Sequence, residues 1–200
     1  MKRLGLDFDN TLIRYDELFH KLAVEKKLIA DSVPPKKKLI RDNLRQKGIE
    51  VEWTKLQGEV YGKRIHEAVA WEGMLEALSK LQRKGNELFL VSHKTQVPYL
   101  GPSYDLHAAA RSWLIKQGFF SKCGLNWEPD HVFFELTMEE KIERIRKLEC
   151  THYVDDLPEI LEILPNSVKK IFFCPGENSP NINKEWLILR RWVDLPDLLL

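Results

Sequence analysis

The sequence has few cysteines, and their spacing excludes the usual cysteine-based sites. Its 200 residues include three cysteines, Cys123, Cys150 and Cys174, which lie far from one another. They form no Cys-x-x-Cys pair and no cysteine–histidine cluster with the spacing of a zinc site. This argues against a disulfide-rich secreted scaffold and favours a reducing compartment, so we expect a cytoplasmic protein.

Long apolar runs and an excess of one charge are also lacking. No apolar stretch approaches the length that crosses a bilayer, and aspartates interrupt the first apolar run too early for a signal peptide. The formal net charge is +1, from 31 basic and 30 acidic residues. Nothing therefore marks the chain as a nucleic-acid-binding protein. We expect no membrane or nucleic-acid partner, and the sequence indicates no oligomeric state.

The chain does have enough apolar residues, 44% of the total, for a sizeable core. From residue 72 onward, patterns typical of strands and helices alternate with short links. The predicted strands cover residues 86–92, 131–134, 151–156 and 169–174. The predicted helices cover 74–84, 106–117, 138–148 and 157–164, with Asp105 capping the second, and Thr137 and Glu140 forming a capping box on the third. This alternation predicts the α/β class, with a doubly wound parallel sheet covered by helices.

The segment 14–72 differs, because it has helical spacing throughout and no convincing strand. We therefore predict a core of residues 1–13 and 73–200, with a small helical domain of residues 14–72 inserted after the first strand. Two prolines, Pro34 and Pro35, are expected to open its second helix. The basic residues of that helix favour a solvated face over an anion-steering patch, and their role stays open.

Polar side chains follow the predicted strands at the edge where parallel sheets bind ligands. Asp7 and Asp9 follow the first strand, Ser92 ends the second, and Asp155 ends a later one. Lys141 lies in the helix that leads into that later strand. Crowded carboxylates need a cation, and Mg2+ takes one or two of them while keeping sites for water and phosphate oxygens. A lysine and a hydroxyl suit a phosphate, so the set indicates phosphoryl transfer.

Four segments now resemble a known family. "DFDNT", "VSHKT", the lysine of "TMEEKIERI", and "YVDD", in that order, are similar to the four motifs of the haloacid dehalogenase-like (HAD) superfamily. The resemblance covers residues 1–13 and 73–175. It implies a Rossmann-like core with a helical cap inserted after the first motif, and residues 14–72 fit that cap.

The resemblance also implies roles for individual residues. Asp7 would be the nucleophile that forms an aspartyl-phosphate, and Asp9 would protonate the leaving oxygen and then deprotonate water. The residues implied or proposed to bind phosphate are Asn10, Ser92, His93 and Lys141. The Mg2+ ligands would be Asp7, the backbone carbonyl of Asp9, Asp155 and Asp156, with Glu159 as an alternative to Asp156.

Asp9 also bears on the type of reaction. Members of the family that cleave carbon–halogen bonds have no acid two residues after the nucleophile, because a halide leaves without a proton. The acid is present here. We therefore expect a Mg2+-dependent phosphatase acting on a small phosphorylated metabolite. The alternatives are a phosphotransferase or sugar-phosphate mutase on the same fold, and a phosphate-responsive regulatory module without turnover.

Overall fold

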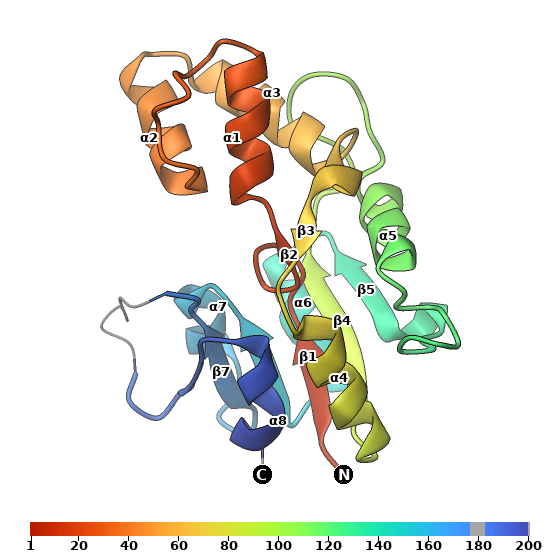
Figure 1. Ribbon diagram of the computed structural model, residues 1–200. Helices are drawn as coiled ribbons and strands as arrows, with labels where there is room; N and C mark the ends of the chain where they lie inside the picture. The colour runs from red at the N-terminus through yellow and green to blue at the C-terminus, as the bar shows by residue number, and fades with distance from the viewer. Residues whose placement is uncertain (177–182, 200) are drawn as a thin grey trace. The chain divides into compact units, whose positions relative to one another are not determined.

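A computed structural model describes residues 1–176 and 183–199 of the chain (Figure 1). The chain divides into two compact units, which are described separately below. Unit 1 comprises residues 1–12, 70–93 and 118–200, and unit 2 comprises residues 13–69 and 94–117. Of the predicted core range 73–200, residues 177–182 and 200 lie outside the described residues. No helix in the described ranges is long and apolar enough to cross a membrane.

Unit 1 is built around a six-stranded sheet whose neighbouring strands all pair in parallel, in the order β5-β4-β1-β6-β7-β8. The strands are β1 (Arg3–Leu6), β4 (Glu87–His93), β5 (Val132–Glu135), β6 (His152–Asp155), β7 (Lys169–Phe173) and β8 (Leu187–Leu189). The apolar runs at β1 and β4 form strands because both of their faces are covered, which is the usual setting of a parallel sheet. The predicted fold class is confirmed.

Helices cover both faces of this sheet. They are α4 (Met74–Arg83), α6 (Met138–Lys147), α7 (Pro158–Ile163) and α8 (Leu195–Leu198), with the short 3-10 helices η2 (Pro129–His131) and η3 (Trp192–Asp194). Since successive strand residues point to opposite faces, Phe89 and Val91 of β4 pack in one apolar cluster with residues of α6 and α7. Figure 1 shows α4 and α8 on the opposite face. The capping box of α6 is present as predicted.

The strand order reverses at β1. The chain runs from β1 to β4 and β5 on one side, then returns to β6 on the other side and continues to β7 and β8. β1 therefore lies between β4 and β6, with Leu6 paired to both Leu90 and Val154. The carboxyl ends of these three strands meet at the topological switch point, where open α/β sheets bind ligands.

A glycine in β1 allows the sheet to pack closely at this point. A Cβ on Gly5 would lie 2.5 Å from Cδ2 of Tyr153, a contact that real Cβ atoms do not make. The absence of a side chain lets the fully buried Tyr153 ring lie against β1, where its hydroxyl donates to the carbonyl of Val91 in β4. This tyrosine ring also lies 5.4 Å from Nζ of Lys141, so it supports a residue of the site.

Unit 2 is mainly helical. Its elements are α1 (Asp16–Glu25), α2 (Lys37–Gln46), α3 (Glu50–Tyr61), the 3-10 helix η1 (Ile65–Glu67) and α5 (Leu106–Lys116). Its core is aromatic: the Phe19 and Trp53 rings are stacked 4.8 Å apart, and Tyr61 packs edge-on against Phe19. The short strands β2 (Ile13–Arg14) and β3 (Val69–Ala70) pair with each other where the chain passes between the units.

Residues 94–117 belong to unit 2, whereas the sequence alone placed them in the core range 73–200. Asp105 caps α5 as predicted, accepting a hydrogen bond from the Ala108 amide at 2.8 Å. The reason for the different grouping is tertiary: Trp113 of α5 is fully buried, and its Nε1 donates to the carbonyl of Ala68 at 2.8 Å. Helical periodicity does not tell which neighbour a helix packs against.

Three further expectations differ from the structure. The strand at residues 169–174 is not the last one, because β8 follows it and extends the sheet. The inserted segment contains the short strands β2 and β3 as well as helices. Pro34 and Pro35 precede α2 rather than open it, because the helix begins at Lys37.

Candidate active site

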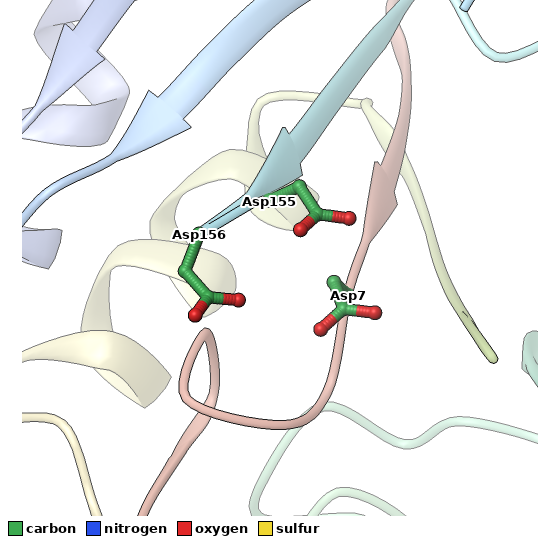
Figure 2. A group of neighbouring side chains, drawn as sticks. All are labelled: Asp7, Asp155 and Asp156. Atoms are coloured by element: carbon green, nitrogen blue, oxygen red, sulfur yellow. The ribbon is translucent and has the colours of Figure 1, made fainter. Parts of the chain in front are cut away.

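Three aspartates meet at the carboxyl ends of β1 and β6. Asp7 follows β1 directly, Asp155 ends β6, and Asp156 is the next residue. One carboxylate oxygen from each lies within 4.8 Å of the others, and Figure 2 shows the three side chains gathered where the two strands end. The amide of Asp7 donates to the carbonyl of Val154 at 2.9 Å, so the β1–β6 ladder itself fixes their spacing. We call these three residues the carboxylate cluster.

Lys141 and Ser92 bind this cluster from the neighbouring elements. Nζ of Lys141, in the first turns of α6, lies 2.8 Å from Oδ1 of Asp7 and 2.8 Å from Oδ2 of Asp155. Oγ of Ser92, near the end of β4, donates to the same Oδ1 of Asp7 at 2.8 Å. Both donors therefore hold one oxygen of Asp7, which fixes the direction of its other oxygen, Oδ2.

Burial makes the electrostatics of the site strong. Lys141 is 2% exposed and Asp155 is 0% exposed. Burial raises the pKa of the Asp155 carboxyl to about 7, and the charge of Asp7 adds to this while Lys141 opposes it. Burial alone would lower the pKa of Lys141, but attraction to Asp7, with contributions from Tyr153 and Asp155, outweighs it and raises that pKa well above its usual value.

The carboxylate cluster has the composition of a site for a hard divalent cation. Three carboxylates face one ammonium, so full ionisation leaves excess negative charge in a buried position, which a cation would neutralise. Carboxylate oxygens are the ligands that Mg2+ prefers. Among the described residues the cluster contains Asp156 and not Glu159, which is exposed on α7. Asp156 therefore lies in the cluster, and the sequence alternative Glu159 lies outside it.

The loop after β1 carries two more predicted site residues. Asp9 is half-buried, and its carboxylate is not part of the cluster, so any metal contact would come from its backbone carbonyl, as the resemblance implies. Asn10 adopts a left-handed conformation with φ of +60°, and its carbonyl accepts a hydrogen bond from Nε1 of Trp71 at 2.9 Å. Between Asp7 and Asp9, Phe8 is fully buried and anchors the loop.

His93 lies apart from the oxygen contacts described so far. It is exposed, and its Nε2 is 3.0 Å from the carbonyl of Leu136, in the link between β5 and α6. The structure therefore places Ser92, Lys141, Asp155 and Asp156 together with Asp7, whereas Asn10 and His93 have backbone partners.

Sequence reasoning missed Thr11, Trp71 and the role of Trp192. Thr11 is fully buried, and its Oγ1 donates to Oδ1 of Asp156 at 3.2 Å, so it links the loop after β1 to the cluster. Nε1 of Trp192 donates to the carbonyl of Thr11 at 3.2 Å. The available signal was the need of a buried indole N–H for an acceptor, but the sequence does not say which acceptor it meets.

No protein-family model matches the chain. A "putative nucleotidase" of Oceanobacillus iheyensis is 25% identical over 208 residues, covering 100% of this chain and 98% of that protein.

Solved structures of hydrolases are similar to the chain in fold. A HAD-superfamily hydrolase of Geobacter sulfurreducens matches with a TM-score of 0.59 at 12% identity, over 100% of this chain and 96% of that one. A "predicted phosphoglycolate phosphatase" of Haemophilus somnus matches with a TM-score of 0.56 at 14% identity, over 100% and 98%. The chain therefore has the fold of the haloacid dehalogenase-like superfamily, which is the fold that the resemblance implies.

Proposed function

We propose that the protein is a Mg2+-dependent phosphatase that hydrolyses a small phosphorylated metabolite through an aspartyl-phosphate on Asp7. The observation that carries this proposal is the set of contacts around Asp7. Its carboxylate meets a buried ammonium, a buried hydroxyl and two further carboxylates at a topological switch point. The likeness to a nucleotidase along the full chain supports the same reaction class.

Mg2+ would be held by Asp7, Asp155 and Asp156, with the backbone carbonyl of Asp9, and would offset the charge of the phosphoryl group during transfer. The residues of the chain supply the other requirements. Ser92 and Lys141 would hydrogen-bond phosphate oxygens while keeping Asp7 oriented. The pairing of Lys141 with Asp7 and Asp155 also keeps its ammonium charged, which a phosphate dianion requires.

In the first step, an oxygen of Asp7 forms a bond to phosphorus as the bond to the leaving oxygen breaks. The carboxyl of Asp9 gives its proton to that oxygen, and an alcohol is released. In the second step, the Asp9 carboxylate takes a proton from water, whose oxygen bonds to phosphorus as the bond to Asp7 breaks. Inorganic phosphate leaves, and both aspartates return to their starting forms.

Residues 13–69 of unit 2 correspond in chain position to a cap, and we propose that unit 2 selects the substrate. The names of the relatives suggest two classes for a first screen, nucleoside monophosphates and phosphorylated 2-hydroxy acids. The mutase alternative adds sugar phosphates as a third. Which class is preferred would identify the metabolite, and isomerised sugar phosphate without free phosphate would instead indicate a mutase.

The test is phosphate release from such a panel, with and without Mg2+. We expect turnover that needs Mg2+ and that falls below detection in Asp7→Asn. Asp197→Asn, a change to an exposed aspartate of α8, is the matched control and should keep full activity. Retained steady-state turnover in Asp7→Asn would exclude Asp7 as the nucleophile, and binding of phosphate mimics without any turnover would indicate a regulatory module.

A further inference from the structure

Three successive carbonyls after β1 are held by two tryptophans that lie far away in the sequence. Nε1 of Trp71 donates to the carbonyl of Asn10 at 2.9 Å, and Nε1 of Trp192 donates to the carbonyl of Thr11 at 3.2 Å. The backbone amide of Trp71 donates to the carbonyl of Leu12 at 3.3 Å. All of these residues belong to unit 1.

Support from the two tryptophans matters to this loop for two reasons. Asn10 has a φ of +60°, a conformation that costs energy for a residue with a side chain. A carbonyl buried without a donor would cost further free energy, and Thr11 and Trp192 are both buried, at 0% and 1% exposure. The two indole N–H groups therefore select one conformation of the loop.

The tryptophans are themselves fixed in place. The ring of Phe173, at the end of β7, packs against Trp71 at a centroid distance of 5.1 Å and against Trp192 at 5.5 Å. Gly73 has a φ of +71°, and a Cβ added there would lie 2.4 Å from Cγ1 of Val193. The segment that carries Trp71 thus packs closely against the segment that carries Trp192, with no room for a side chain at residue 73.

The held loop connects directly to the chemistry. Asp9 immediately precedes the first held carbonyl, and Thr11, whose carbonyl Trp192 holds, donates through Oγ1 to Asp156 at 3.2 Å. A shift of this loop would move the proposed proton donor, Asp9, while Asp7 stays held by Ser92 and Lys141. Small displacements of a catalytic group cost large factors in rate.

We propose that Trp71 and Trp192 are positioning residues for the phosphoryl-transfer reaction, acting through the loop that carries Asp9. This proposal rests on the proposed function, since it assigns the tryptophans to the same site. It predicts a specific defect. Losing an indole N–H should impair protonation of the leaving oxygen more than it impairs attack by Asp7.

The variants that test this are Trp192→Phe and Trp71→Phe, which remove the N–H and keep an aromatic ring. The matched control is Trp113→Phe, because Trp113 is also fully buried and donates its Nε1–H to a backbone carbonyl, that of Ala68 in unit 2. Each variant is compared on two substrates. One is an alkyl phosphate, whose leaving group is poor, and the other is p-nitrophenyl phosphate, whose leaving group departs without protonation.

We expect kcat for the alkyl phosphate to fall about tenfold to a hundredfold in the two site variants, with KM changed less than about twofold. For p-nitrophenyl phosphate the fall should be less than about threefold. Trp113→Phe should show equal small effects on both substrates. Hydrogen exchange of the amides of residues 8–12 should accelerate in the site variants and not in the control, a readout that needs no turnover.

Equal losses on both substrates, or unchanged exchange at residues 8–12, would overturn the assignment. If Trp192→Phe fails to fold, Trp71→Phe still tests the positioning role, because Trp71 is only half-buried. A wild-type protein that releases no phosphate from any substrate would refute the proposed function. If the wild-type protein is active and the two site variants lose activity equally on both substrates, the positioning role alone is refuted.

Discussion

The two units each contain a network of opposite charges, and the two networks differ in burial. In unit 1, Lys141 is buried between Asp7 and Asp155. In unit 2, Arg64 bonds to Glu67 and Glu25, and Lys21 bonds to Glu67 at 2.8 Å, with side chains 22–55% exposed. We call this second group the exposed ion network.

The pKa values follow this difference. Hydrogen bonds from Arg64 and then Lys21 lower the pKa of Glu67 to about 2, so the folded state stabilises the charged form of Glu67. Burial instead raises the pKa of Asp155 to about 7, so the same charge on Asp155 is costly. Pairing satisfies the exposed ion network, whereas the buried cluster keeps an excess of carboxylates. Ordinary pairing of surface charges accounts for the first network, whereas the proposed metal binding would account for the excess of carboxylates in the second.

The largest effect that would sharpen this comparison is expected from Lys141→Met. Removing the ammonium leaves Asp7 and Asp155 buried without their partner, which typically costs about 3–5 kcal/mol. Urea unfolding without Mg2+ measures the loss. Lys21→Met in the exposed ion network is the control and should cost less than about 1 kcal/mol. Comparable losses in the two variants would remove the distinction between the networks.

Added Mg2+ should stabilise the wild-type protein by about 2.7 kcal/mol at a concentration one hundred times its dissociation constant. The thermal midpoint measured with and without the ion gives this value. Asp156→Asn should abolish most of the shift, because Asp156 belongs to the carboxylate cluster. Glu159→Gln should keep it, and the reverse result would show that Glu159 supplies the ligand.

His152 should make the stability of unit 1 sensitive to acid. Its side chain is buried, and burial, with repulsion from Lys169 and Lys2, lowers its pKa to about 4. Between pH 6.5 and 4 the unfolded chain binds a proton that the folded chain does not, so stability falls as pH falls through that window. The loss is on the order of 3 kcal/mol. Asp155, with its raised pKa, changes stability in the opposite sense within this window. Urea midpoints of the wild type and of His152→Asn therefore isolate the His152 contribution, and the stability of the wild type relative to this variant should fall as pH falls.

The smallest effect is expected from Glu67→Gln. This change removes the shared partner of Arg64 and Lys21, yet all of these groups reach solvent, so the cost should stay below about 1 kcal/mol and shrink in added salt. The pH range over which Glu67 affects stability should lie below that of His152. The Glu67 carboxylate contributes stability that is lost as pH falls from about 4.5 toward 2. A loss of several kcal/mol would contradict the comparison.

The sequence predicts the central part of the fold well, because strands buried on both faces and capped helices leave local signals. The run "LFLV" of β4 and the capping box of α6 are examples. It predicts the carboxylate cluster for a related reason: Asp7 and Asp155 end parallel strands, and such ends meet at one edge.

Elements whose position depends on distant partners were not predictable. β8 is three residues long, and its apolar triplet has no periodicity to read. The grouping of α5 with unit 2 depends on the Trp113 contact with Ala68, and the role of Trp192 depends on the carbonyl of Thr11. Each is one specific tertiary contact between residues that no local pattern relates.

The hydrogen bond from the Trp71 amide to the Leu12 carbonyl has a consequence for how this protein can vary. Leu12 is the last residue before the chain leaves unit 1, and Trp71 is the second after it returns. The ends of the intervening segment are thus already joined, so its length enters stability through loop closure, at about 0.6 kcal/mol for each doubling. Insertions or deletions between these two residues should be tolerated by unit 1, which frees that segment to change in size while the aspartates keep their places.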